Sequence, residues 1–138
     1  MNRINDKIKE IEKYIGQLES VVPLTLEEYE SDFKIKAICE HYFEKIVESA
    51  VDLAFLFIKN EGLKIPEDDK NAFEILQDNN IISEKLSRKL QNAKGMRNII
   101  SHEYGQIDDS IVFEAVGEQL EKDINEFIGD IKEASIEK

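Results

Sequence analysis

The residue types best suited to chemistry are gathered in one short segment, residues 96–105. The segment contains Arg97, Asn98, Ser101, His102 and Tyr104. A histidine with a pKa near ~6.5 can accept or donate a proton, and an arginine donates several coplanar hydrogen bonds to phosphate oxygens. These two types favour metal-independent cleavage of a phosphodiester bond, with His102 transferring a proton and Arg97 binding the phosphate.

The spacing of these residues decides which side chains can meet. On an α-helix Asn98 and His102 share a face, as do Arg97 and Ser101. Arg97 and His102 are about 140° apart around the helix axis, so they meet only if the helix end turns His102 back. An alternative stays open on spacing alone: Arg97 pairs with an acidic neighbour, and His102 only caps the helix.

Charge is distributed unevenly around this segment. The chain has 18 basic and 30 acidic residues and a formal charge of −12, which argues against indiscriminate nucleic-acid binding. Residues 81–101 nevertheless hold five basic residues and one acidic residue. Besides Arg97, the basic residues are Lys85, Arg88, Lys89 and Lys94. We interpret them as a local strip that binds RNA phosphates, the alternative being a solvated helix face balanced by acidic neighbours.

Apolar spacing predicts that helices position this segment. A first helix carries a stripe made of Ile4, Ile8, Ile11, Ile15 and Leu18, and Pro23 closes it. Thr25 and Glu28 form a capping box that starts a second helix. We expect this helix to run unbroken to Gly62, with an apolar set that includes Tyr29, Phe33, Ile38, Tyr42, Phe43, Ile46 and Val47.

The remaining helices follow from caps and stripes. After a loop over residues 59–70, a short helix is expected over residues 71–78, and Ser83 caps a helix that ends near His102. Asp108 or Asp109 caps the last helix, whose stripe is Val112, Val116, Leu120, Ile124, Phe127 and Ile131. The predicted fold is all-α: one domain over residues 1–138, an antiparallel bundle of four long helices and a short one.

Composition excludes several classes of protein. A single cysteine, Cys39, rules out an internal disulfide and a multi-cysteine metal site, and two histidines make a histidine-rich metal site improbable. The longest apolar run, residues 53–58, is far shorter than the ~20 residues that span a bilayer. We therefore expect a cytoplasmic protein with no metal site. Because that run is apolar on all sides, we also expect a second subunit to cover it.

The motif Arg97-Asn98-x-x-x-His102-x-Tyr104 resembles the R-x4-H-x-Y signature of the HEPN superfamily, specifically the HepT toxins. Chain length, the helical bundle, the hydrophobic second helix and the position of Asp108 fit the same family.

The resemblance implies a metal-independent endoribonuclease, the toxin of a type VII-like toxin–antitoxin system. Arg97 and His102 map to the ribonuclease site, Asn98 maps to the polar residue beside the arginine, and Ser101 would support them. A nucleotidyltransferase antitoxin of the MntA type, using ATP and Mg²⁺, would attach AMP to Tyr104; the toxin itself needs no cofactor. Two copies would face one shared cleft as a homodimer. The alternative is a non-catalytic helical binding subunit of a nucleotidyltransferase complex.

Overall fold

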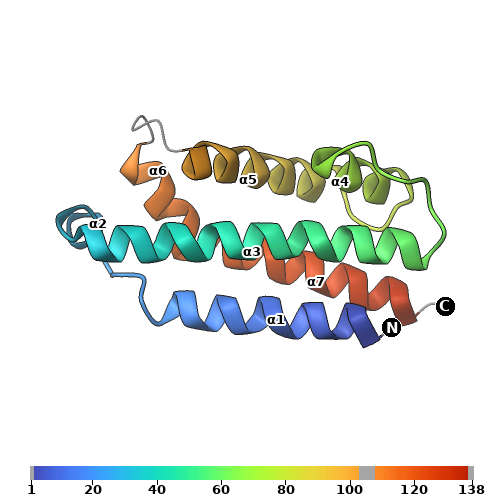
Figure 1. Cartoon of the computed structure of the whole chain (residues 1–138), viewed down its shortest axis with the longest axis horizontal. Coiled ribbons are helices and arrows are strands. Elements are labelled where there is room, and N and C mark those ends of the chain that lie inside the picture. Colours follow the sequence, from blue (N-terminus) through green and yellow to red (C-terminus); the bar gives the residue numbers. More distant parts are fainter. Residues whose placement is uncertain (1, 103–107, 137–138) are drawn as a thin grey trace.

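The computed structural model describes residues 2–102 and 108–136, and these form a helical bundle (Figure 1). The helices are α1 (Asn2–Glu19), α2 (Leu26–Ser31), α3 (Phe33–Asn60), α4 (Asp69–Asp78), α5 (Glu84–His102), α6 (Asp109–Glu114), the π-helical turn η1 (Ala115–Gln119) and α7 (Leu120–Ile136). No strand occurs within these ranges. The predicted all-α class is confirmed.

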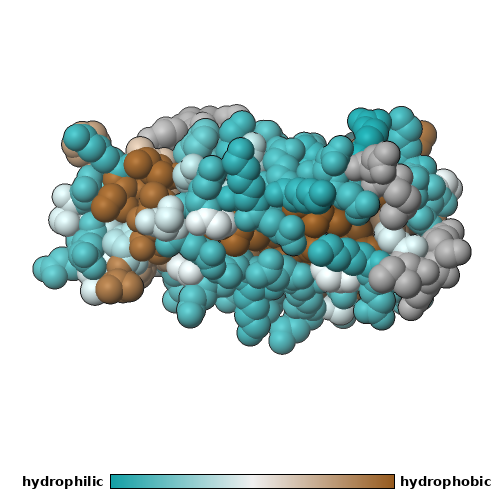
Figure 2. Space-filling model, turned by 90° about the horizontal axis from the view of Figure 1, so that it is seen from below, coloured by the Kyte–Doolittle hydropathy of each residue, from teal (hydrophilic) through white to brown (hydrophobic). Residues whose placement is uncertain are grey.

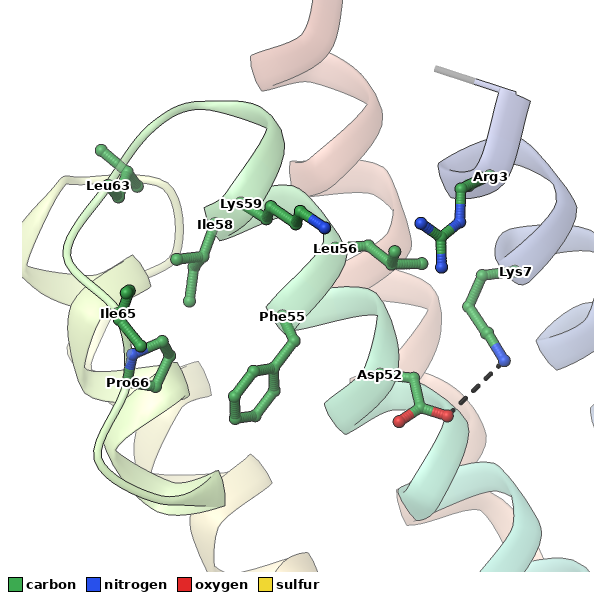
Figure 3. A pocket seen from close by; sticks show the side chains of 10 residues that line it. All are labelled: Arg3, Lys7, Asp52, Phe55, Leu56, Ile58, Lys59, Leu63, Ile65 and Pro66. Atoms are coloured by element: carbon green, nitrogen blue, oxygen red, sulfur yellow. Dashed lines mark ion pairs between the residues drawn. The ribbon is translucent and has the colours of Figure 1, made fainter.

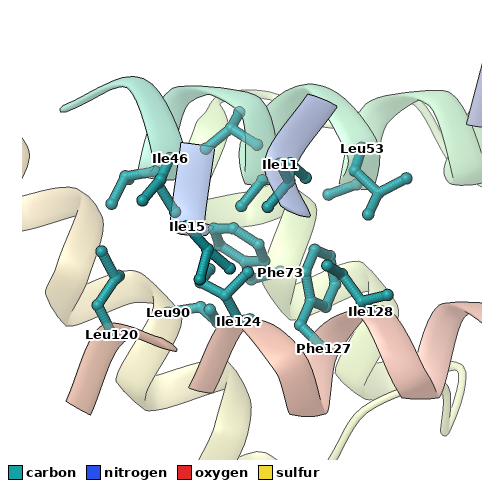
Figure 4. Close-up of a cluster of buried hydrophobic side chains, with 14 of the residues drawn as sticks. Ile11, Ile15, Ile46, Leu53, Phe73, Leu90, Leu120, Ile124, Phe127 and Ile128 are labelled. Atoms are coloured by element: carbon teal, nitrogen blue, oxygen red, sulfur yellow. The ribbon is translucent and has the colours of Figure 1, made fainter. Parts of the chain in front are cut away.

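The four long elements α1, α3, α5 and α7 run alternately up and down. In Figure 1, α3 spans the length of the molecule, α1 lies below it, and α5 lies above it with α4 alongside. Their facing side chains form one core, part of which is drawn in Figure 4. Its largest fully buried members include Tyr29, Phe43, Phe57, Phe73, Phe127, Ile11, Ile46 and Leu53. This core fixes α5 against α3, α4 and α7.

Most of the predicted stripes are buried. All five apolar residues of the α1 stripe are at most 7% exposed, and the six apolar residues of the last helix are at most 3% exposed. The predicted caps are also present. The amide of Glu28 donates to Thr25 Oγ1 at 3.1 Å, and the amide of Leu86 donates to Ser83 Oγ at 3.0 Å. Asp108 accepts from the amide of Ser110 at 2.8 Å.

The prediction of one unbroken second helix is wrong. Asp32 adopts an extended conformation, with φ −128° and ψ 101°, and its carboxylate caps α3 by accepting from the amides of Lys34 and Ile35. Phe33 is 76% exposed and Ile38 is 41% exposed, although both belong to the predicted apolar set. Both lie on α3, and at 100° per residue they fall outside the face that buries Phe43, Ile46 and Ala50. A short polar side chain that can bond to nearby amides explains why the helix restarts here.

The last helix is also not one regular α-helix. Residues 115–119 form a π-helical turn, in which the amide of Leu120 donates to the carbonyl of Ala115. The apolar residues Val112, Val116 and Leu120 are four residues apart. On a regular α-helix, each step of four residues rotates the side chain by about 40° away from the previous one. Wider i→i+5 bonding compensates this drift, so Val112, Val116 and Leu120 all remain buried.

The surface is mostly hydrophilic in the view from below, with hydrophobic atoms gathered at the end that holds α2 and in a strip along the middle (Figure 2). The most exposed large apolar side chains near α2 are Leu24, at 93%, and Phe33. Among the described residues, no helix is long and apolar enough to cross a membrane.

Candidate active site

The motif lies in the second half of α5. Leu86, Leu90 and Ile100 are buried and fix one side of this helix in the core. The helix continues to His102, as the sequence predicted. Asn98 and His102 are therefore one helical turn apart on the same face of the backbone.

Arg97 is held by α3. Its Nη2 donates to Glu48 Oε2 at 2.9 Å, and its side chain is only 22% exposed. Its Nε is buried and has no hydrogen-bond partner among the described residues. The ion pair that the alternative interpretation expects is thus present. It occupies one nitrogen of the guanidinium, which carries five N–H donors, so it does not prevent phosphate binding.

Asn98 is held through a lysine. Lys94 Nζ donates to Asn98 Oδ1 at 2.9 Å and lies 3.2 Å from Asp69 Oδ2 at the start of α4. An ammonium group only donates hydrogen bonds, so the amide oxygen of Asn98 must face it. The amide nitrogen, with two N–H donors, is then directed elsewhere.

The other predicted motif residues are described less completely. Ser101 and His102 belong to the last turn of α5, but their side chains lie outside the described part of the structure. Tyr104 lies outside the described residues altogether. The structure therefore brings together Arg97, Asn98 and Lys94, and it does not place the His102 imidazole.

A cleft of about 390 Å³ lies beside Arg97, between α3, α4 and α5. We call it the motif cleft; it is lined by Glu48, Val51, Asp52, Phe55, Asp69, Lys94 and Arg97. Its three carboxylates all have a cationic partner, because Asp52 lies 3.5 Å from Lys7 Nζ. The cleft is therefore a charge-balanced support for Arg97 rather than a strongly positive surface.

A second, more apolar hollow of about 600 Å³ adjoins the motif cleft and shares Asp52 and Phe55 with it (Figure 3). We call it the Phe55 hollow; it is lined by Arg3, Lys7, Asp52, Phe55, Leu56, Ile58, Lys59, Leu63, Ile65 and Pro66. In Figure 3, Ile65 and Pro66 lie on one side of the Phe55 ring and the α1 residues Arg3 and Lys7 lie on the other. The hollow exposes part of the apolar run 53–58, where Phe55 and Leu56 are half-buried.

The basic residues of α5 point in several directions. Lys89 lies 3.6 Å from the buried Asp123 of α7, and Arg88 pairs with Glu84 on its own helix at 3.0 Å. Lys85 is exposed, and no ion pair is found for it among the described residues. Since most of these cations have a carboxylate partner, α5 does not present a continuous positive strip.

Sequence reasoning missed Glu48 and Asp69 as partners of the motif. Glu48 is 49 residues from Arg97 in the chain, so no local spacing links the two. Asp68 caps α4 by accepting from the amide of Asn71 at 2.8 Å. The ion pair of Asp69 with Lys94 follows only from the packing of α4 on α5. No group of three or more potential ligands within the described ranges is placed to hold a metal ion.

The chain is similar to a known family over most of its length. Residues 11–131 match the family described as "Ribonuclease HepT-like". The "mRNA nuclease HepT" of Shewanella oneidensis is 30% identical over 129 residues, which cover 94% of this chain and 96% of that protein. The "tRNA nuclease HepT" of Aphanizomenon flos-aquae is 26% identical over 119 residues, covering 86% of this chain and 81% of that protein.

A solved structure shows the same fold. It is the tri-AMPylated Shewanella oneidensis HEPN toxin in complex with MNT antitoxin. The toxin superposes with a TM-score of 0.86 at 29% identity, covering 94% of this chain and 96% of its own. The likeness extends over nearly the whole bundle, so it includes the helices that support the motif cleft.

Proposed function

The chain belongs to the HepT-like ribonuclease family, and from this premise we propose that Arg97 and His102 cleave RNA and that a nucleotidyltransferase partner silences the enzyme at Tyr104. Its activity is that of a ribonuclease, and its role is that of the toxin in a toxin–antitoxin pair. One observation carries the site assignment: Glu48 of α3 fixes Arg97 beside the motif cleft. Because α5 stays helical to His102, Arg97 and His102 of one chain lie about 140° apart around the helix axis and do not share a face.

The chemistry follows from these positions. His102 accepts the proton of the ribose 2′-hydroxyl or donates one to the leaving oxygen, and its place at the C-terminus of a helix favours the protonated form. The free N–H donors of Arg97 and the amide of Asn98 stabilise charge on the phosphate. The reaction needs no cofactor in this proposal; ATP and Mg²⁺ serve the partner. The exposed Lys85 and Arg88 contact RNA phosphates further along the strand, whereas Lys89 is directed toward Asp123 of α7.

The working unit in this proposal is a homodimer in the cytoplasm. Cleavage needs one proton acceptor and one donor, whereas each chain supplies one motif histidine. Two copies around a two-fold axis supply both. The half-buried Phe55 and Leu56 in the Phe55 hollow offer apolar area for such a contact. Light scattering at micromolar concentration should give the mass of a dimer, and a monomer would contradict the shared cleft.

Silencing is proposed to occur by AMP transfer to the hydroxyl of Tyr104. The similar Shewanella toxin is tri-AMPylated in its complex with an antitoxin. Each AMP brings a phosphodiester charge and a nucleoside next to Arg97 and His102. It therefore competes with RNA phosphate for the arginine and fills the site.

The ribonuclease assignment is tested by Arg97→Ala and His102→Ala. Loss of one acid–base group typically lowers the rate by about 10²–10⁴-fold, so each variant should lose toxicity and RNA cleavage. Growth after induction and RNA integrity report the outcome, and circular dichroism should show an unchanged helical content. Full activity of His102→Ala would contradict the assignment.

The silencing mechanism is tested by Tyr104→Phe, which keeps the ring and removes the acceptor oxygen. After co-expression with the partner, the wild-type chain should gain about 329 Da for each AMP, and the variant should remain toxic. Intact-mass measurement decides between mechanisms. A wild-type chain that is neutralised without any mass gain would show that the partner acts by occlusion alone.

A further inference from the structure

Both polar motif residues whose side chains are described are linked to carboxylates on other helices, Arg97 directly and Asn98 through Lys94 of α5. Glu48 of α3 accepts from Arg97 Nη2 at 2.9 Å. Asp69 of α4 lies 3.2 Å from Lys94 Nζ, which donates to Asn98 Oδ1 at 2.9 Å. One carboxylate thus contacts Arg97 of the motif directly, and a second carboxylate from another helix is linked to the neighbouring Asn98 through Lys94.

These contacts differ from ordinary surface ion pairs on the same helix. The side chains of Arg97 and Lys94 are 22% and 13% exposed and their carboxylate partners 51% and 43%, whereas those of Arg88 and Glu84 are 69% and 70% exposed. Water and salt screen a half-buried pair less than an exposed one. The two inter-helix pairs can therefore hold a long side chain in one orientation.

Orientation matters for the donors that remain. With Nη2 bound to Glu48, the remaining N–H groups of the two Nη nitrogens are left for a phosphate, whereas Nε is buried and has no partner among the described residues. With its oxygen facing Lys94, Asn98 directs its N–H groups away from the lysine. A preorganised set of donors stabilises transition-state charge without having to rearrange during the reaction.

We propose that Glu48 and Asp69 are positioning residues for RNA cleavage. Glu48 orients the guanidinium of Arg97, and Asp69 orients the amide of Asn98 through Lys94. This inference rests on the ribonuclease site proposed above and assigns Lys94 to the support of Asn98 rather than to contact with RNA. The opposing interpretation is that Glu48 competes with phosphate for Arg97 and slows the enzyme.

The variants Glu48→Ala and Glu48→Gln separate these interpretations. Glutamine keeps an acceptor oxygen for Arg97 and removes the charge, whereas alanine removes both. We expect Glu48→Ala to lower kcat by about 10- to 100-fold with little change in KM, and Glu48→Gln to restore most of kcat. The matched controls Glu12→Ala and Glu12→Gln change the exposed pair of Glu12 on α1 with Lys132 on α7 and should leave both constants unchanged. Equal or higher activity of Glu48→Ala would overturn the proposal.

Salt dependence tests the role of Lys94. A lysine that contacts RNA phosphate contributes about 0.7 to the slope of log binding constant against log salt concentration for a single strand. For Lys94→Met we expect an unchanged slope and a reduced kcat, and for Asp69→Asn a reduced kcat of the same kind. A smaller slope with unchanged kcat would show that Lys94 binds RNA directly and would overturn its positioning role. Thermal melting of each variant gives the folded fraction by which rates are corrected.

Arg97→Ala in the same assay separates this inference from the proposed site. If Arg97→Ala still cleaves RNA, the proposed site and the inference fail together. If Arg97→Ala is inactive while Glu48→Ala and Asp69→Asn cleave like the wild type, only the positioning roles fail.

Discussion

The helices α1 and α5 are nearly equal in length, with 18 and 19 residues, but they serve the molecule differently. α1 presents one regular stripe of five buried apolar residues along its whole length. In α5 the buried apolar residues are Leu86 and Leu90 in the first half and Ile100 near the end, and half-buried polar residues lie between them. Of these, Lys94 and Arg97 reach carboxylates on other helices.

This contrast separates stability from chemistry. A complete apolar stripe contributes mainly the free energy of removing hydrocarbon from water. Half-buried polar side chains cost desolvation and contribute little net stability unless they are well paired. Beside the motif, Arg97 and Lys94 are paired with carboxylates, which offsets this cost, and their proposed role is the orientation that these pairs impose on Arg97 and Asn98.

The strongest test of the contrast is Ile11→Ala in α1. Ile11 is fully buried, and truncating such a side chain in a core typically costs about 2–5 kcal/mol of the free energy of unfolding. We expect that loss in a urea titration, with cleavage per folded molecule unchanged. The matched control is Ile111→Ala, because Ile111 is 53% exposed and its loss should cost less than about 1 kcal/mol. Reduced cleavage by folded Ile11→Ala would show that α1 also shapes the site.

The role of α1 could be predicted from the sequence because its pattern is local. The steps of four and three residues between Ile4, Ile8, Ile11 and Ile15 define one helical face, and any partner surface that is apolar can cover it. The cap residues Thr25 and Ser83 are equally local, since each bonds to an amide three residues away. The motif Arg97-x4-His102 could likewise be identified from the sequence alone, because its residues are close together in the chain.

The support of the motif could not be predicted in this way. Glu48 and Asp69 are two of 30 acidic residues, and only tertiary packing selects them as partners of Arg97 and Lys94. The break at Asp32 was missed because apolar residues continue on both sides of it. The apolar pattern alone therefore gave no sign that Asp32 caps a new helix. The π-helical turn at residues 115–119 was missed for a related reason, since steps of four residues fit an α-helix almost as well.

A second prediction concerns Lys85, the exposed cation at the start of α5. We expect Lys85→Gln to reduce the slope of log RNA affinity against log salt concentration by about 0.7, because one phosphate contact is lost. Stability should change by less than about 0.5 kcal/mol. Lys132→Gln is the control: Lys132 is a comparably exposed cation on α7, 3.8 Å from Glu12, and should leave the slope unchanged. Equal slopes for both variants and the wild type would show that Lys85 does not contact RNA.

The smallest expected effect concerns the exposed pair Glu84–Arg88, which tests whether ion pairs on α5 differ by location. The two side chains are 70% and 69% exposed, and their atoms lie 3.0 Å apart within one helical turn. Such i,i+4 pairs contribute about 0.3–0.5 kcal/mol at low salt. Glu84→Gln should lower the free energy of unfolding by no more than this amount, and the loss should disappear at high salt because exposed charges are screened. Denaturant titrations at low and high salt measure both values. A loss of stability that persists at high salt would mean that salt does not screen this exposed pair. The distinction between the local pair Glu84–Arg88 and the inter-helix pairs of Arg97 and Lys94 would then have no physical basis.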